Sequence, residues 1–162
     1  MAIRPTRSIK IFYCYAHEDK LLRDELAKHL TPLKRMGQIT EWHDRDIQAG
    51  TNWEREIEVH ISMASIILLL VSPDFINSDY CYGVEMQRAL ARHRSGEAYV
   101  IPIILRPVHW ERTPLGTLQA LPPEGRPITR WSDRDEAFWN VAAGIPPQVS
   151  PKRRFWQRKG EK

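Results

Sequence analysis

The run Ile66-Ile67-Leu68-Leu69-Leu70-Val71 constrains the fold of this chain more than any other feature of the sequence. Its apolar residues are not interrupted by polar ones, which predicts a central strand at 65–71 that is buried on both faces. The run is far shorter than the roughly 20 apolar residues that a membrane-spanning helix needs. A strand buried on both faces requires a sheet with helices on each side.

The segments around this run alternate between strand and helix patterns. Further strands are expected at residues 9–14, 38–43 and 99–105, with a short last strand at 127–131. Helices are expected at residues 21–36, 53–64, 78–94 and 133–144. This alternation predicts a single α/β domain with a parallel sheet, whose ligand crevice lies at the carboxyl ends of the strands.

Local signals set several of these boundaries. Gly37 is expected to stop the first helix, and Thr51 or Asn52 is expected to cap the second. Pro102 cannot donate a hydrogen bond within a sheet, so it favours an edge strand or a bulge. The first helix is expected to bury a stripe of leucines, namely Leu21, Leu22, Leu26, Leu30 and Leu33.

The basic character of the chain is confined to its last residues. The 162-residue chain has a formal net charge of +4. Residues 150–162 contain six Lys and Arg residues against one Glu, a net charge of +5, which leaves −1 for residues 1–149. A nearly neutral body argues against nucleic-acid binding, which would need a basic stripe. The tail is either a linker, a juxtamembrane segment that contacts a membrane, or a solubilising end.

The two cysteines, Cys14 and Cys81, have neither metal-ligand spacing nor the arrangement of a disulfide framework. We therefore expect small buried residues, no bound metal and a reducing compartment. Residues 1–7 lack the apolar core of a signal peptide. Together these features predict a cytoplasmic protein.

The helix expected after the apolar run carries an unusual carboxylate. Glu85 follows Tyr80, Cys81, Tyr82 and Val84, which are poor neighbours for a solvated carboxylate. A carboxylate held against apolar and aromatic groups is a candidate functional residue, because its surroundings control its ionisation. The alternative is a surface residue on an amphipathic helix.

Four stretches of the chain together match the motifs of a known family in order and spacing. They are Ile11 to Asp19, Asp44 to Trp53, Ser72 to Glu85, and the aromatic pair Phe138-Trp139. On these stretches the chain resembles Toll/interleukin-1 receptor (TIR) domains of the bacterial type, and residues 44–53 resemble their BB loop. The resemblance implies a flavodoxin-like three-layer fold with a five-stranded parallel sheet flanked by helices. It also implies a TIR domain at 8–145, an N-terminal extension at 1–7, and a basic tail or linker to a further module at 146–162.

The resemblance implies one of two functions. Many TIR domains are NAD+ glycohydrolases that release nicotinamide and form ADP-ribose or a cyclic ADP-ribose, and they are activated by self-association. Such an enzyme would act in bacterial immune signalling against viruses, with NAD+ as its substrate and no cofactor. The alternative is a non-enzymatic scaffold that works through TIR–TIR contacts of the loop at 44–53.

Glu85 matches the catalytic glutamate of the TIR enzymes. The family often has Trp-Cys-x-x-Glu, whereas this chain has one more residue between Cys81 and the glutamate. Either Tyr80 or Cys81 therefore takes the place of the tryptophan. Ala16 and His17 align with two basic residues of an animal TIR enzyme, so the contacts to the substrate phosphates are expected to differ there.

A single carboxylate is a sufficient catalytic inventory for cleavage of NAD+. Nicotinamide leaves as a neutral group, so the reaction does not need the paired carboxylates of ordinary glycosidases. One carboxylate can stabilise the cationic ribose and hold its hydroxyls. The nicotinamide needs an aromatic slot, for which the candidates are Tyr15, Trp53 and Tyr80, with Trp110 further away. For each of them, packing is the alternative.

Three polar residues are further candidates for substrate contacts, and each has a structural alternative. Ser72 either donates a hydrogen bond to the substrate or ends the strand before Pro73. Asp46 binds the ribose or caps its own loop. His17 contacts a phosphate or is solvated.

Two other classes of protein with related folds are excluded by the sequence. A phospho-acceptor receiver domain needs paired acidic residues after the first strand, whereas Glu18-Asp19 opens the following helix. A dinucleotide-binding Rossmann domain needs a Gly-x-Gly-x-x-Gly motif, which this chain lacks.

Overall fold

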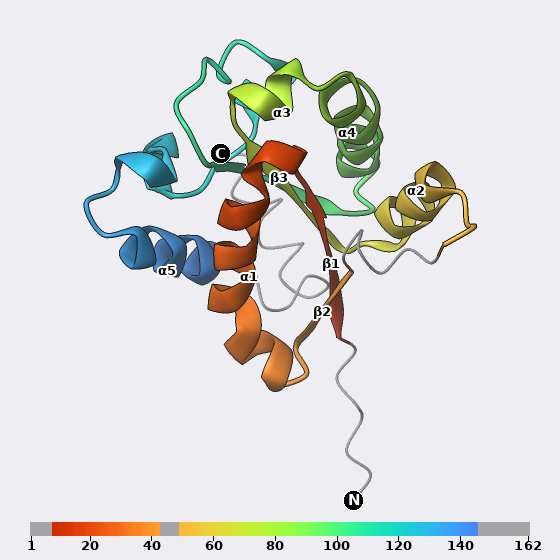
Figure 1. The fold of residues 1–162 in the computed structure, drawn as a ribbon, viewed down its shortest axis with the longest axis horizontal. Helices are drawn as coiled ribbons and strands as arrows, with labels where there is room; N and C mark the ends of the chain where they lie inside the picture. The colour runs from red at the N-terminus through yellow and green to blue at the C-terminus, as the bar shows by residue number, and fades with distance from the viewer. Residues whose placement is uncertain (1–7, 43–48, 146–162) are drawn as a thin grey trace, which may run out of the picture.

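The computed structural model describes residues 8–42 and 49–145 as a parallel sheet with helices on both faces (Figure 1). The strand order is β2-β1-β3-β4, and the strands are β1 (Ile9–Cys14), β2 (Ile39–Trp42), β3 (Ile66–Val71) and β4 (Tyr99–Ile104). The α-helices are α1 (Lys20–Arg35), α2 (Trp53–Met63), α3 (Pro73–Asn77), α4 (Met86–Arg94) and α5 (Arg134–Gly144). The other helical turns are η1 (His17–Asp19), η3 (Cys81–Glu85), η4 (Pro114–Thr117), η5 (Pro123–Gly125) and η6 (Ile128–Arg130).

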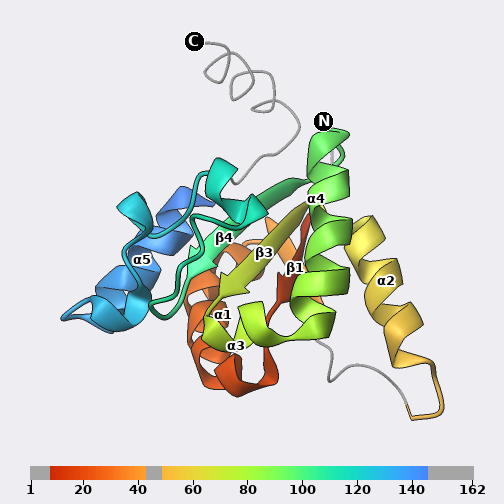
Figure 2. The same cartoon turned by 90° about the horizontal axis from the view of Figure 1, so that it is seen from above.

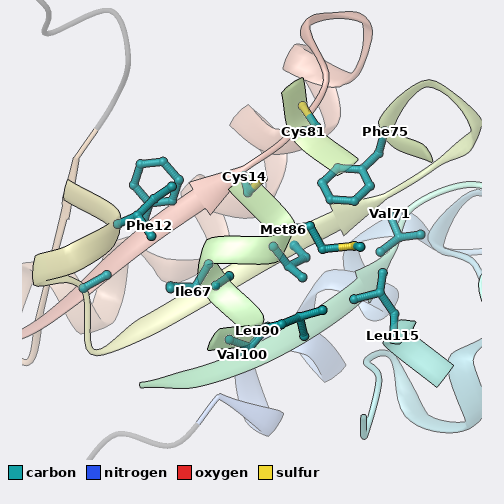
Figure 3. Close-up of a cluster of buried hydrophobic side chains, with 14 of the residues drawn as sticks. Phe12, Cys14, Ile67, Val71, Phe75, Cys81, Met86, Leu90, Val100 and Leu115 are labelled. Atoms are coloured by element: carbon teal, nitrogen blue, oxygen red, sulfur yellow. The ribbon is translucent and has the colours of Figure 1, made fainter. Parts of the chain in front are cut away.

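The helices form two layers around the sheet. Helices α1 and α5 lie on one side, and α2 and α4 lie on the other (Figure 2). Side chains alternate between the two faces of each strand, so Phe12 and Cys14 pack toward α2 and α4 whereas Ile11 and Tyr13 pack toward α1 and α5. Figure 3 shows the first of these two cores. Every residue of β3 is fully buried, as its uninterrupted apolar sequence predicts.

Most of the expected boundaries are confirmed. Gly37 follows α1 with a φ of 73°, a left-handed conformation that glycine adopts without steric cost. The Asn52 side chain accepts a hydrogen bond from the Arg55 N–H at 3.2 Å and so caps α2. Pro102 lies in β4, an edge strand of the described sheet. Within residues 8–42 and 49–145, no helix has both the length and the apolarity to span a bilayer.

The expected fifth strand at 127–131 is wrong, because that segment contains the 3-10 turn η6. Leu121 instead makes an isolated bridge to Ile103 in β4, with its N–H bonded to the Pro102 carbonyl at 2.9 Å. Two prolines follow Leu121, and they have no N–H to donate. The pairing therefore cannot continue, and the described part of the chain has four strands.

The predicted leucine stripe on the first helix is wrong at its first residue, Leu21. Leu21 is 80% exposed, whereas Arg23 is only 1% exposed and shares the buried face of α1 with Leu26 and Leu30. Residues three and four apart lie on one face of a helix, so Arg23 joins the buried face in place of Leu21, while Leu22 and Leu33 pack against the same core as predicted. A buried arginine at this point bears on the candidate site described below.

An ionic network ties together the segments that follow β1, β3 and β4. The buried Asp19 carboxylate accepts hydrogen bonds from the Ser72 hydroxyl and, at 2.9 Å, from the Arg106 guanidinium. Arg106 also forms an ion pair with Asp74 at the start of α3. Ser72 in turn caps α3 by accepting the Phe75 N–H at 3.0 Å. These bonds hold one rim of the sheet together.

We predict that Arg106→Gln lowers the free energy of unfolding by about 3 kcal/mol, because it removes two ion pairs and leaves the Asp19 carboxylate buried without its cation. The measurement is urea denaturation followed by circular dichroism. The control is Arg134→Gln, which removes an exposed pair with Glu25 at 3.4 Å and should cost less than about 1 kcal/mol. Equal losses in the two variants would show that the network does not hold the rim.

Candidate functional site

The helix that carries Glu85 is not a regular α-helix throughout. Ser78 begins it by accepting the Cys81 N–H at 3.1 Å, as the capping residues of the sequence predict. The next turn, η3, is a π-helical turn, closed by the Met86 N–H on the Cys81 carbonyl. A π turn holds one more residue than an α turn. It lies at the same point where this chain has one more residue than the Trp-Cys-x-x-Glu spacing.

The π turn directs Glu85 into the protein. The residue is only 6% exposed, which excludes the alternative of a solvated residue on an amphipathic helix. Its Oε1 accepts a hydrogen bond from the Cys14 Sγ, at the end of β1, over 2.9 Å. A buried carboxylate needs such partners because its desolvation is costly. The residues that follow keep α4 in register, with Met86, Ala89 and Leu90 in the core.

Glu85 lines a small pocket at the carboxyl ends of β1 and β2. The pocket has a volume of about 30 Å³ and is lined by Phe12, Tyr13, Tyr15, Arg23, Trp42, Ile57 and Glu85. Aromatic side chains therefore make up most of its wall. Trp42 is stacked between Phe12, with ring centroids 5.8 Å apart, and His60, at 4.1 Å. Its position in this pocket was not predicted from the sequence.

Arg23 brings a positive charge to the same pocket. Its guanidinium carbon lies 5.2 Å from the ring centroids of both Tyr13 and Tyr15. The Nη1 atom of the same group forms an ion pair with Asp24 at 2.7 Å. The Tyr13 hydroxyl donates to Glu41 at 2.6 Å, and burial, followed by the charge of Glu41, raises the Tyr13 pKa well above its ordinary value. The pocket thus combines one carboxylate, one guanidinium and neutral aromatic rings.

The two cysteines meet beside Glu85. The sulfur of Cys81 donates to the Tyr15 carbonyl at 3.4 Å, so both thiols lie next to the pocket. Burial raises the pKa of the Cys14 thiol, whereas the polar contact with Cys14 lowers the pKa of Cys81. The expected burial of both cysteines is confirmed. Their closeness to each other and to Glu85 could not be seen in their spacing.

Of the predicted aromatic contacts, Tyr15 lines the pocket itself. Trp53 and Tyr80 pack together nearby, with ring centroids 5.0 Å apart, and Trp53 remains 49% exposed. Burial, and then the negative charge of Glu85, raises the pKa of Tyr80 to about 12. Trp110 packs against the core between the sheet and helices α2 and α4, next to Gly125.

The polar candidates are less closely gathered. Ala16 is buried, and His17 is exposed in η1. Ser72 is fully buried, and its hydroxyl bonds to Asp19 and to the Phe75 N–H, which is the arrangement of a structural cap. Asp46 and the first half of the loop, residues 44–48, lie outside the described residues.

Comparison with known proteins identifies the family. A family model for the TIR domain matches residues 11–137, and the chain belongs to this family. The chain is 57% identical over 135 residues to the uncharacterized protein y4lF of Sinorhizobium fredii (strain NBRC 101917 / NGR234), a match that covers 83% of this chain and 42% of that protein. The chain therefore spans less than half the length of this relative.

A solved structure supports the same conclusion. The crystal structure of the TIR domain of the Toll-related receptor TRR-2 from Hydra magnipapillata matches with a TM-score of 0.50 and 26% sequence identity. The match covers 61% of this chain and 72% of that chain. The TIR resemblance and the α/β class with a parallel sheet flanked by helices are thus confirmed.

We predict that deletion of Gly83 is tolerated, because it converts the π turn into an α turn without rotating the flanking segments, and removes a helical glycine that costs about 1 kcal/mol. Deletion of Gln87 from the regular helix α4 is the control. It turns Ala89 and Leu90 away from the core by about 100° and should cost more than about 2 kcal/mol. Urea denaturation measures the free energy of unfolding of the two variants. Similar losses of this free energy would argue that the π turn does not accommodate an inserted residue.

Proposed function

We propose that this TIR domain is an NAD+ glycohydrolase that acts in the cytoplasm of bacteria, with Glu85 as its catalytic residue. The observation that carries the proposal is the buried Glu85 carboxylate on the wall of an aromatic pocket. The TIR family membership supports it, since the family includes such enzymes. Immune signalling against viruses is the proposed biological role.

The proposed reaction breaks the bond between the ribose C1′ and the nicotinamide nitrogen. The bonding electrons leave with the nicotinamide, which departs neutral, and the ribose becomes a cation of the oxocarbenium type. The fixed negative charge of Glu85 stabilises this cation and accepts hydrogen bonds from the ribose hydroxyls. Attack by water, with loss of a proton to solvent, gives ADP-ribose, and attack by an adenine nitrogen gives a cyclic product.

Aromatic groups near Glu85 suit the nicotinamide ring. Tyr15 lines the pocket, and the half-exposed Trp53 packs on Tyr80, whose pKa is raised by burial and then by Glu85, so either Tyr15 or the Trp53–Tyr80 pair offers a ring for stacking. The neutral Tyr80 phenol, with a pKa of about 12, adds no charge at neutral pH. Arg23, which forms an ion pair with Asp24 at 2.7 Å, places a positive charge on the same pocket wall as Glu85. Ala16, His17, Asp46, Ser72 and Cys81 complete the proposed contacts.

The size of the pocket supports activation by self-association. A volume of about 30 Å³ holds little more than one water molecule, whereas ligand pockets usually measure about 300–1,000 Å³. A nicotinamide riboside therefore fits only if the rim opens or if a neighbouring protomer completes the site. We propose that the loop at 44–53, which ends at the exposed Trp53, makes this contact between protomers.

The small volume of the pocket also favours a second function, a scaffold that recruits other TIR domains and turns over no NAD+. A pocket too small for the substrate is what a scaffold without turnover would show. The scaffold would assemble through the same loop and leave Glu85 with a purely structural hydrogen bond to Cys14.

The test is nicotinamide release from NAD+, with products separated by chromatography, over a wide range of protein concentration. We expect turnover per protomer to rise with concentration, and Glu85→Gln to lower it at least about 100-fold, because the charge opposite the ribose cation is lost. Glu136→Gln makes the same chemical change at an exposed position of α5, on the opposite face, and should leave turnover unchanged.

The two functions give different results in this experiment. Unchanged turnover in Glu85→Gln would remove Glu85 from the chemistry. Assembly without nicotinamide release at any concentration, including under crowding, would establish the scaffold instead.

A further inference from the structure

Three side chains of types that can bind metals converge where the sequence predicted no metal. The sulfur atoms of Cys14 and Cys81 and a carboxylate oxygen of Glu85 all lie within 4.8 Å of one another. All three side chains are buried, and they come from the end of β1 and from the two ends of the π turn. Figure 3 shows Cys14 and Cys81 at this end of the core.

We propose that Cys14, Cys81 and Glu85 form a binding site for a thiophilic divalent cation of the zinc class. Two thiolates and a carboxylate are ligands that Zn²⁺ accepts, whereas Mg²⁺ and Ca²⁺ prefer oxygen ligands throughout. Zinc–sulfur bonds of about 2.3 Å and zinc–oxygen bonds of about 2.1 Å need ligand atoms roughly 3.5–3.8 Å apart. The distance between the Cys14 sulfur and the Glu85 oxygen is 2.9 Å, and all three ligand atoms lie within 4.8 Å of one another, so the required spacing falls within the observed range.

Only small side-chain movements are needed to form the site. The hydrogen bond between Cys14 and Glu85 opens, and the thiols of Cys14 and Cys81 release their protons to solvent as they bind the cation. The π turn brings Cys81 and Glu85 onto one face of their helix, and β1 supplies the third ligand. Water occupies the fourth position, as it does in zinc sites with three protein ligands.

The site would regulate the enzyme because it uses the proposed catalytic carboxylate. This consequence, unlike cation binding itself, rests on the proposed function. A cation bound to Glu85 cancels the negative charge that would stabilise the ribose cation, so binding inhibits NAD+ cleavage. The chain would then be active only when the cation is removed or displaced.

Cobalt titration of the reduced protein tests binding without reference to activity. Co²⁺ is the probe, added under anaerobic conditions with a non-thiol reductant. We expect a thiolate-to-cobalt charge-transfer band and the visible bands of a tetrahedral site, both removed when Zn²⁺ is added. Cys14→Ser and Cys81→Ser should each weaken binding more than about 100-fold, since the loss of a direct ligand exceeds that of an outer-shell partner.

His29→Gln is the control, because it removes a partly buried imidazole on α1, across the sheet from the three ligands, that stacks on Phe138 and lies 3.0 Å from Asp135; it should leave the cobalt spectrum unchanged. If Cys14→Ser does not fold, Cys81→Ser and Glu85→Gln carry the test. A spectrum without the charge-transfer band, or one that persists in Cys81→Ser, overturns the proposal.

Activity measurements separate this proposal from the proposed function. Zn²⁺ should inhibit nicotinamide release by the unmodified protein, and a chelator should restore it, whereas Cys81→Ser should lose its sensitivity to Zn²⁺. A protein that binds cobalt but never cleaves NAD+ refutes the enzyme and keeps the metal site. A protein that cleaves NAD+ equally well with and without Zn²⁺ refutes the regulatory site and keeps the enzyme.

Discussion

The burial of β3 on both faces is the constraint on which the rest of the structure depends. All of its residues are inaccessible, so the sheet must be covered by α1 and α5 on one side and by α2 and α4 on the other. Because every strand is parallel, each connection returns the chain to the same end of the sheet. The ends of β1 and β2 and the helix after β3 therefore meet at one edge, and the pocket beside Glu85 forms there.

Within that edge, the position of Glu85 depends on a departure from regular geometry. In an α-helix, a residue four positions after Cys81 lies about 40° further round the axis. The π turn, with its lower rotation per residue, changes this offset, and in the structure Glu85 lies within hydrogen-bond distance of Cys14. The sequence difference from the usual motif is thus absorbed locally, and the core positions of α4 stay in register.

The regular elements could be predicted because their local and long-range signals agree. The apolar run of β3, the Asn52 cap and the Gly37 stop each act within a few residues, and the structure confirms them. Features that depend on distant partners could not be predicted. Arg23 was missed because arginine on a helix is usually solvated, although it lies three residues before the buried Leu26. The contact between Cys14 and Glu85 joins positions 71 residues apart, and no spacing rule reaches that far.

One partner of Glu85, the Cys14 thiol, bears on both proposals. A thiol is a weak hydrogen-bond donor, so Cys14 satisfies the buried carboxylate less firmly than a guanidinium or a backbone N–H would. A stronger partner, such as a ribose hydroxyl, can therefore replace it at low cost. A thiophilic cation can do the same while binding the two sulfurs as well. A group that competes for Glu85 thus competes with the proposed substrate, and the weak thiol contact at Oε1 is one that either group can replace.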